Sequence, residues 1–211
     1  MNRQMVLLIV ASIMGFASIS NAQSSYFSRY LEGERFGVPR EYRTLLYIDA
    51  VQKELAIGPE QLEELEQVLE NPPSIAKASD KRVAMQEFEA SLEEVLDPDQ
   101  WKRCVELRIQ KAGSASLIRE DIVAKLSLSE KQLADLRKLR EQAISDAFSA
   151  GFRLGFRPGD PSPAELKKNA AERRARQERS LKKGLDMLTQ AQRDRFDQLR
   201  GEPFAFPDSD E

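Results

Sequence analysis

Paired carboxylates are the side chains of this sequence that come nearest to catalytic chemistry. Glu63-Glu64 and Glu93-Glu94 are adjacent acids, and two carboxyl groups placed across a substrate can serve as an acid and a base. Residues next to each other on a helix do not face each other, however, and no nucleophile or substrate-binding loop accompanies them. We therefore interpret these pairs as solvated faces of helices.

Metal sites and nucleophilic catalysis lack the residues that they need. The sequence has no His and a single Cys, which excludes His-dependent triads, His general bases and the usual zinc sites. Cys104 shares the apolar stripe of a predicted helix with Trp101 and Val105, so we expect a buried thiol. The acidic residues at 208–211 do not have the spacing of a calcium loop. We predict no enzyme, no catalytic residue, no cofactor and no bound metal.

The start of the sequence indicates export. Arg3 precedes an apolar run from Met5 to about Ala17, and Ser20-Asn21-Ala22 is a small-x-small cleavage site. The apolar run is shorter than the roughly 20 residues that span a bilayer. We therefore predict a cleaved signal peptide at residues 1–22, a periplasmic or secreted location and no stable membrane insertion.

Charge is divided unevenly along the chain, although the formal net charge is only −3. Residues 54–99 contain thirteen acidic side chains against three basic ones, and residues 164–183 contain eight basic side chains against three acidic ones. A basic stretch in an exported protein favours a solvated helix that covers an acidic surface or faces an anionic partner. We therefore predict no binding to nucleic acid.

A five-residue pattern recurs four times and predicts where helices begin. In each copy an apolar residue precedes a capping residue, and a Gln follows the cap by three positions. The four pairs of cap and Gln are Gly58 and Gln61, Asp97 and Gln100, Ser129 and Gln132, and Thr189 and Gln192. Each member of such a pair can satisfy a backbone N–H of the other, so the pattern predicts helix-capping motifs.

Helical periodicity dominates the whole sequence. Segments rich in Glu, Lys, Leu and Ala alternate with helix breakers, and no alternating run of β-branched residues predicts a strand. We expect a weakly ordered segment at 23–38, a helical domain at 39–200 and an acidic tail at 201–211. The predicted helices are 39–56, 59–70, 79–95, 98–112, 116–127, 130–153, 163–187 and 190–199.

The motifs are arranged as a duplication. Residues 51–65 align without gaps on residues 122–136, and each segment is followed by a second copy of the motif. We therefore predict pseudo-repeats at about 39–112 and 116–200 that pack into one body. The fold class is all-α, a pseudo-duplicated helical bundle or hairpin array.

Phenylalanines near the C-terminus are candidates for contact with a partner. Phe148 and Phe152 have helical spacing, so we expect them in the core. Phe156, Phe204 and Phe206 fall in proline-flanked loops, where an apolar side chain either docks on the body or meets a partner.

The signal peptide, the helical pattern and the repeated motif together resemble the Spy/CpxP family of periplasmic proteins, whose members carry a Leu-Thr-x-x-Gln motif. Residues 188–192 and 128–132 match that motif most closely. The resemblance implies a small helical protein that acts as an ATP-independent chaperone or envelope-stress modulator, in a family that forms cradle-shaped dimers. This chain has four motifs instead of two and lacks the His ligands of the family's zinc-binding branch. The doubled number of motifs suggests that one chain folds into the structure that the family forms from two chains.

These observations lead to one functional expectation and one alternative. We expect a monomeric or homodimeric protein that binds other polypeptides, as a chaperone or envelope-stress modulator. The alternative is a regulatory or structural adaptor for a single cell-envelope partner. A chaperone accepts many clients through an adaptable surface, whereas an adaptor forms one tight complex.

Overall fold

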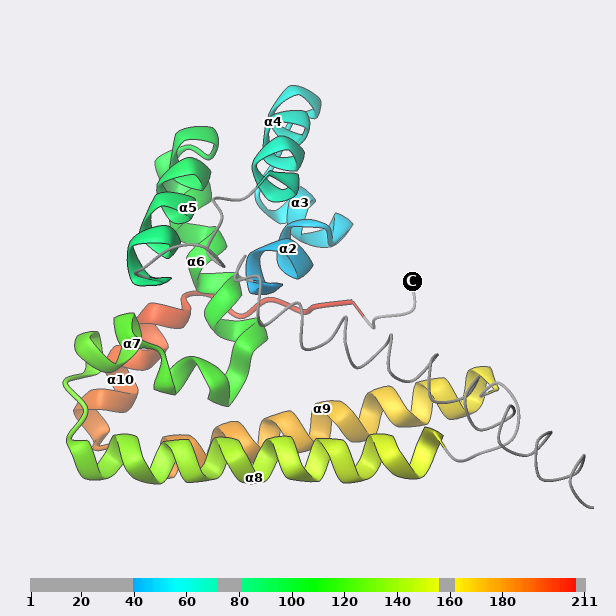
Figure 1. The fold of residues 1–211 in the computed structure, drawn as a ribbon, viewed down its shortest axis with the longest axis vertical. Helices are drawn as coiled ribbons and strands as arrows, with labels where there is room; N and C mark the ends of the chain where they lie inside the picture. Colours follow the sequence, from blue (N-terminus) through cyan, green and yellow to red (C-terminus); the bar gives the residue numbers. More distant parts are fainter. Residues whose placement is uncertain (1–39, 72–80, 156–161, 208–211) are drawn as a thin grey trace, which may run out of the picture. The chain divides into compact units, whose positions relative to one another are not determined.

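The structure is a computed structural model that describes residues 40–71, 81–155 and 162–207 (Figure 1). Within these ranges every regular element is a helix, which confirms the predicted all-α fold. The predicted signal peptide and the segment 23–38 lie outside the described residues. None of the helices in the described ranges is long and apolar enough to cross a membrane.

Most helices begin and end close to the positions predicted from the sequence. The bounds of α4 and α6 agree with the prediction, and each begins with a proline, whose missing N–H is not needed in the first turn. The described helices are α2 (Arg40–Leu46), α3 (Asp49–Glu54), α4 (Pro59–Glu70), α5 (Lys81–Val95), α6 (Pro98–Ala112), the 3-10 helix η1 (Gly113–Ile118), α7 (Glu120–Leu126), α8 (Glu130–Gly155), α9 (Pro163–Asp186) and α10 (Gln190–Arg200).

The predicted helix 39–56 is wrong as a continuous element. The chain breaks between α2 and α3, where Ile48 has an extended backbone with φ −87° and ψ 115°. The side-chain amide of Gln52 donates to the carbonyl of Leu46 at 2.8 Å, so this carbonyl at the end of α2 is paired. The side-chain bond replaces a backbone bond of the helix. The segment contains no glycine or proline that would have predicted the break.

The predicted helix 116–127 is also divided. It starts as the 3-10 helix η1, and the α-helical part begins only at Glu120. The hydroxyl of Ser116, which is buried, donates to the carbonyl of Gly113 at 2.6 Å and tightens this turn. A short 3-10 turn after a helix end is a common way to pair terminal carbonyls.

The chain divides into two compact units, of which unit 1 comprises residues 1–44 and 58–96. Within unit 1, α4 and α5 form an antiparallel hairpin, and the side chain of Gln61 at the start of α4 donates to the carbonyl of Val95 at the end of α5. The hydroxyl of Tyr42 donates to Glu89 at 2.9 Å. The buried apolar side chains of unit 1 are Tyr42, Leu65, Leu69, Ala84, Phe88, Leu92 and Leu96.

Unit 2 comprises residues 45–57 and 97–211. Its long helices α8 and α9 run antiparallel side by side, and η1 packs against both of them and against α6 and α7 (Figure 1). Buried apolar residues from five elements meet at this point, and Leu181 and Leu185 of α9 pack against them, which gives unit 2 a core that α8 and α9 could not form alone. The core cluster consists of Ile109, Leu117, Ile122, Leu126, Leu136, Leu188 and Phe196.

The compact units have different boundaries from the predicted pseudo-repeats. Helices α3 and α6 belong to unit 2, although the predicted first half extends from residue 39 to residue 112. The sequence repeat and the division into compact units are therefore two different features of this chain.

Candidate functional site

Three of the four motif copies carry reciprocal hydrogen bonds at a helix start. The Asp97 carboxylate accepts from the backbone N–H of Gln100 at 2.9 Å, and the Gln100 side chain accepts from the backbone N–H of Asp97 at 2.9 Å. The same pair of bonds joins Ser129 to Gln132 at α8 and Thr189 to Gln192 at α10. A cap of this kind stabilises a helix by about 1 kcal/mol.

The first motif copy works differently, because Gly58 has no side chain to cap α4. Gly58 has an extended backbone with φ −77° and ψ 165°, and its carbonyl accepts from the N–H of Leu62 at 2.9 Å. The side-chain amide of Gln61 donates to the Val95 carbonyl at 2.8 Å. In this copy the glutamine therefore links two helices of unit 1.

The other three motif glutamines also donate to a distant backbone carbonyl. Gln100 reaches Leu55 at 2.9 Å, Gln132 reaches Met187 at 3.1 Å and Gln192 reaches Leu126 at 3.3 Å. An amide can accept in the cap and donate elsewhere at once, whereas a carboxylate can only accept. The motif residues are thus occupied in holding backbone segments together, and the sequence-based interpretation as helix caps missed this second bond.

The acidic pairs do not form a catalytic or metal-binding arrangement in the described residues. Glu63, Glu64, Glu93 and Glu94 are exposed side chains on α4 and α5. No group of three or more Cys, Asp or Glu side chains in the described ranges is placed to hold a metal ion.

Cys104 is completely buried in α6, which confirms the predicted burial. Burial raises the pKa of this thiol to about 12, against the opposing effect of the Arg108 guanidinium. The thiolate, which is the reactive form, is therefore suppressed in the folded protein.

We expect Cys104 to react slowly with an aqueous thiol reagent in native buffer, even when the pH is raised past about 8.5, the usual pKa of a free thiol. In denaturant the reaction should be fast and should follow the titration of a free thiol. Stopped-flow labelling at several pH values measures both rates. Equal rates in native buffer and in denaturant would contradict burial and would reopen a redox role for this residue.

The C-terminal phenylalanines of the candidate contact set dock on the body of unit 2. Phe204 and Phe206 are half-buried, and their rings meet edge to face with centroids 4.9 Å apart. The Gln110 side chain accepts from the N–H of Phe204 at 2.9 Å and donates to the carbonyl of Glu202 at 2.8 Å. Residues 201–207, the described part of the predicted acidic tail, thus lie along α6 as a strap, and residues 208–211 lie outside the described residues. Phe156 lies outside the described residues.

The strap is also held by cationic side chains. The Nζ atom of Lys111 lies 5.0 Å from the centroid of the Phe206 ring, and Arg174 donates to the Phe206 carbonyl at 3.3 Å. Partial burial and the neighbouring Arg173 guanidinium lower the pKa of Lys111. Docking of the strap therefore uses part of the basic surface of α9.

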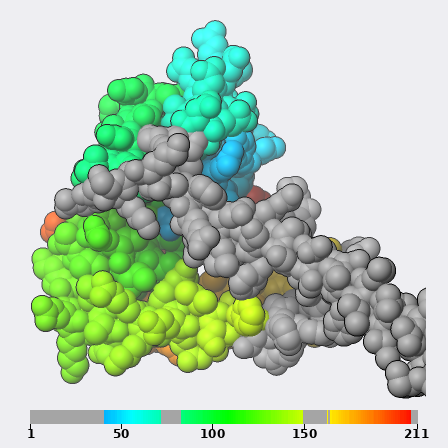
Figure 2. Space-filling model, viewed as in Figure 1, coloured from blue at the N-terminus to red at the C-terminus, as the bar shows by residue number. Residues whose placement is uncertain are grey.

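Phe148 departs from the prediction that places it in the core. Its side chain is 57% exposed, and Ile144, one helical turn earlier on α8, is 52% exposed. Leu166, near the start of the adjoining helix α9, is 40% exposed. Figure 2 shows the side chains of α8 along one face of the molecule. The sequence-based interpretation assigned Phe148 to the core and missed Ile144 as an exposed residue.

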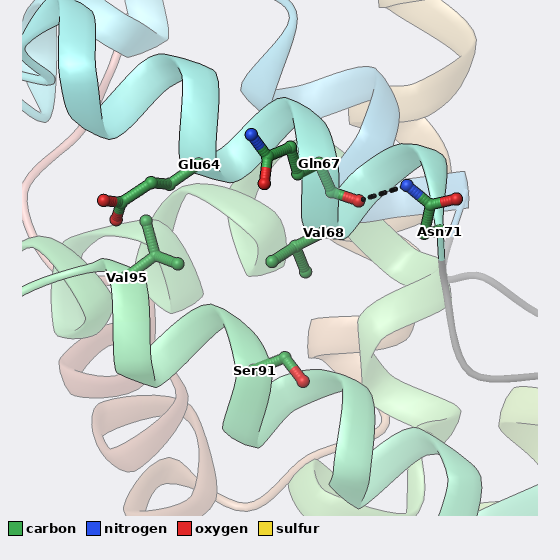
Figure 3. Close-up of a pocket in the computed structure, with 6 residues that line it drawn as sticks. All are labelled: Glu64, Gln67, Val68, Asn71, Ser91 and Val95. Carbon is green, nitrogen blue, oxygen red and sulfur yellow. Dashed lines mark hydrogen bonds between the residues drawn. The ribbon is translucent and has the colours of Figure 1, made fainter.

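A groove lies between the two helices of unit 1. It is lined by Glu64, Gln67, Val68, Asn71, Ser91 and Val95 and has a volume of about 560 Å³ (Figure 3). The figure shows Val68 and Val95 pointing into the space between α4 and α5, with the polar side chains around them. The sequence-based interpretation missed this groove, because it depends on how α4 and α5 pack against each other.

Comparison with models of protein families, with curated proteins and with solved structures gives no match for this chain. Its fold and surfaces define an all-α protein in which the motif glutamines hold the backbone together. In the part of the chain that the structure describes, its surface features include the exposed apolar side chains of α8 and the groove of unit 1.

Proposed function

We propose that this chain binds other polypeptides in the cell envelope and acts as an ATP-independent chaperone. The observation that carries the proposal is the exposed apolar pair Ile144 and Phe148 on α8. Two large apolar side chains one turn apart form a surface on which an unfolded segment can lay its own apolar side chains.

The strength of this surface suits transient binding to many clients. Full burial of a Phe or Ile side chain contributes about 1.5–3 kcal/mol, so covering the exposed half of each contributes on the order of 1 kcal/mol. Polar neighbours on α8, including Glu141, Gln142 and Asp146, are exposed around the pair. They keep the apolar area small, which favours reversible contact over permanent assembly.

The resemblance to Spy/CpxP proteins supports the same function. The predicted signal peptide supports a periplasmic or secreted location. The alternative function is that of an adaptor for one envelope partner. It would use the same surfaces with a single, tightly bound protein.

We also propose that the four motifs form two equivalent pairs, as expected of a duplicated chain. Gln61 and Gln132 each donate to the residue just before the apolar position of the next motif, which is Val95 or Met187. Gln100 and Gln192 each donate to the carbonyl two residues before the apolar position of the preceding motif, which is Leu55 or Leu126. Each of these bonds lies within one compact unit. Their matching offsets support pseudo-repeats at 39–112 and 116–200.

Suppression of client aggregation tests the chaperone function. The purified chain without its predicted signal peptide is mixed at equimolar ratio with several unrelated unfolded clients, and light scattering is followed in the absence of ATP. We expect the wild-type chain to suppress scattering and the double variant Ile144→Ser/Phe148→Ser to lose most of this effect.

The matched control removes two other exposed apolar side chains. Tyr47 and Val83 are 43% and 45% exposed, so Tyr47→Ser/Val83→Ser makes a comparable change elsewhere on the surface. This variant should retain the suppression. If no client is protected by the wild-type chain, the adaptor becomes the better account, and affinity purification should then recover one stoichiometric partner.

A further inference from the structure

We propose that the groove between α4 and α5 binds a Lys/Arg-rich segment of another polypeptide. The inference rests on the proposed polypeptide-binding function and adds the chemical class of the bound segment. The inference is based on two observations: unit 1 has a groove between its helices, and both walls of this groove carry acidic side chains.

The walls of the groove are acidic on both helices. Glu64 lines the groove, and Glu60 lies one helical turn before it on α4. On α5, Glu87 lies one turn before the lining residue Ser91, and Glu94 lies three positions after it, so both share its side of the helix. All four carboxylates are exposed.

Within the described residues of unit 1, basic side chains are scarce around those carboxylates. Helix α4 contains no Lys or Arg, and the basic residues of α5 are confined to its first two positions, Lys81 and Arg82. None of the four rim carboxylates is in an ion pair with another residue of the described ranges. Uncompensated charge of one sign on both walls attracts a ligand of the opposite sign.

The floor of the groove suits the stems of basic side chains. Val68 and Val95 point into it from opposite helices, and Gln67, Asn71 and Ser91 make its remaining surface polar (Figure 3). Lys and Arg bury an aliphatic stem on apolar surface while they keep the charged head in water. A large aromatic side chain would cover these polar groups without pairing them, so the lining favours Lys and Arg.

The spacing of the rim carboxylates fits a regular peptide. Positions four apart on a helix are separated by about 6 Å along the axis. Alternate side chains of an extended strand are separated by about 6.6 Å, so two alternate basic residues of an extended segment match the spacing of Glu60 and Glu64 on α4. Exposed ion pairs are individually weak and sensitive to salt, so the complex should form through several pairs together and dissociate as salt rises.

Peptide binding measured by fluorescence anisotropy tests the proposal. The probe is a labelled peptide in which lysine alternates with alanine and valine, and the comparison peptide has glutamate at every lysine position. We expect the lysine peptide to bind the full processed chain, with an affinity that falls as salt is raised, and the glutamate peptide not to bind.

Two charge-matched variants locate the binding surface. The groove variant is Glu64→Gln/Glu87→Gln, and the control is Glu66→Gln/Glu93→Gln, which removes one charge from each of the same helices at positions that are not three or four residues from any lining residue. We expect the groove variant to weaken lysine-peptide binding by about tenfold or more, and the control to weaken it much less. Circular dichroism melts verify that both variants remain folded.

The outcomes separate this inference from the proposed function. Equal loss of binding in both variants would show that net charge alone attracts the peptide and would overturn the groove proposal. Chaperone activity without lysine-peptide binding would also overturn the groove proposal. Lysine-peptide binding without chaperone activity would support the groove proposal and refute the proposed chaperone function. The chain could also associate with itself in a salt-sensitive way that the groove variant abolishes. That result would overturn the proposal of a segment from another polypeptide, because the basic helix α9 of a second copy would then be the occupant of the groove.

Discussion

Replacement of Phe196 with alanine is expected to lower the free energy of unfolding by about 3–5 kcal/mol. The Phe196 side chain is completely buried in the core of unit 2, beside Leu126 and Leu188. Truncation removes the largest side chain of that cluster and leaves a cavity where α10 packs against α6 and α7. The loss therefore includes both the lost burial and the cavity.

The single tryptophan makes this measurement specific to unit 2. Trp101 is the only Trp in the sequence and lies on α6, so its fluorescence follows the unfolding of unit 2 in denaturant. Phe148→Ala is the matched control, because the same side chain is 57% exposed there and its loss should change stability by less than about 0.5 kcal/mol. A similar loss in the two variants would contradict the assigned core.

The contrast between these two phenylalanines shows what helical spacing can predict. The four-residue spacing of Phe148 and Phe152 is the reason for the prediction that Phe148 lies in the core, and the buried Leu136 precedes Phe148 by three such steps. Each step of four residues advances the helix by 400°, so after three steps Phe148 lies about 120° away from Leu136 around the helix axis. The face that packs inward instead continues through Leu139 and Ala143, which are half-buried.

Local signals account for most of the helix boundaries. Pro59 and Asp97-Pro98 mark the starts of α4 and α6, because proline fixes the backbone of the first turn and an aspartate accepts its free N–H groups. The break at Ile48 has no such signal. It depends on a bond between Gln52 and the Leu46 carbonyl, and either residue alone is compatible with a continuous helix.

The surfaces open to a partner were harder to predict, because they depend on how elements distant in sequence pack. Phe204 and Phe206 are flanked by prolines in the sequence, and only the pairing with Gln110 shows that they are docked. The groove between α4 and α5 similarly requires the two helices to be antiparallel. The sequence predicted the acidic character of this region, but the placement of carboxylates on both walls depends on the fold.

Replacement of Gly201 with alanine is expected to release the strap formed by residues 201–207. Gly201 ends α10 with φ 61° and ψ −160°, a backbone conformation that is essentially restricted to glycine and costs other residues about 1–3 kcal/mol. A Cβ atom at this position would also collide with the carboxylate of Glu106. That carboxylate pairs with Arg103 at 2.9 Å, and Arg103 in turn donates to the carbonyl of Glu202, so displacement of the carboxylate disturbs the link between Arg103 and the strap.

Gly113→Ala separates backbone strain from this collision. Gly113 also has a positive φ of 56°, but a Cβ atom added there meets nothing within 4 Å. Both variants should therefore lose stability from strain, and Gly201→Ala should lose more. Limited trypsin digestion gives the second measurement: cleavage after Arg200 should accelerate in Gly201→Ala and remain slow in Gly113→Ala, because only the first variant displaces the Glu106 carboxylate that pairs with Arg103. Unchanged cleavage in Gly201→Ala would show that the strap is held without the Glu106 and Arg103 pair.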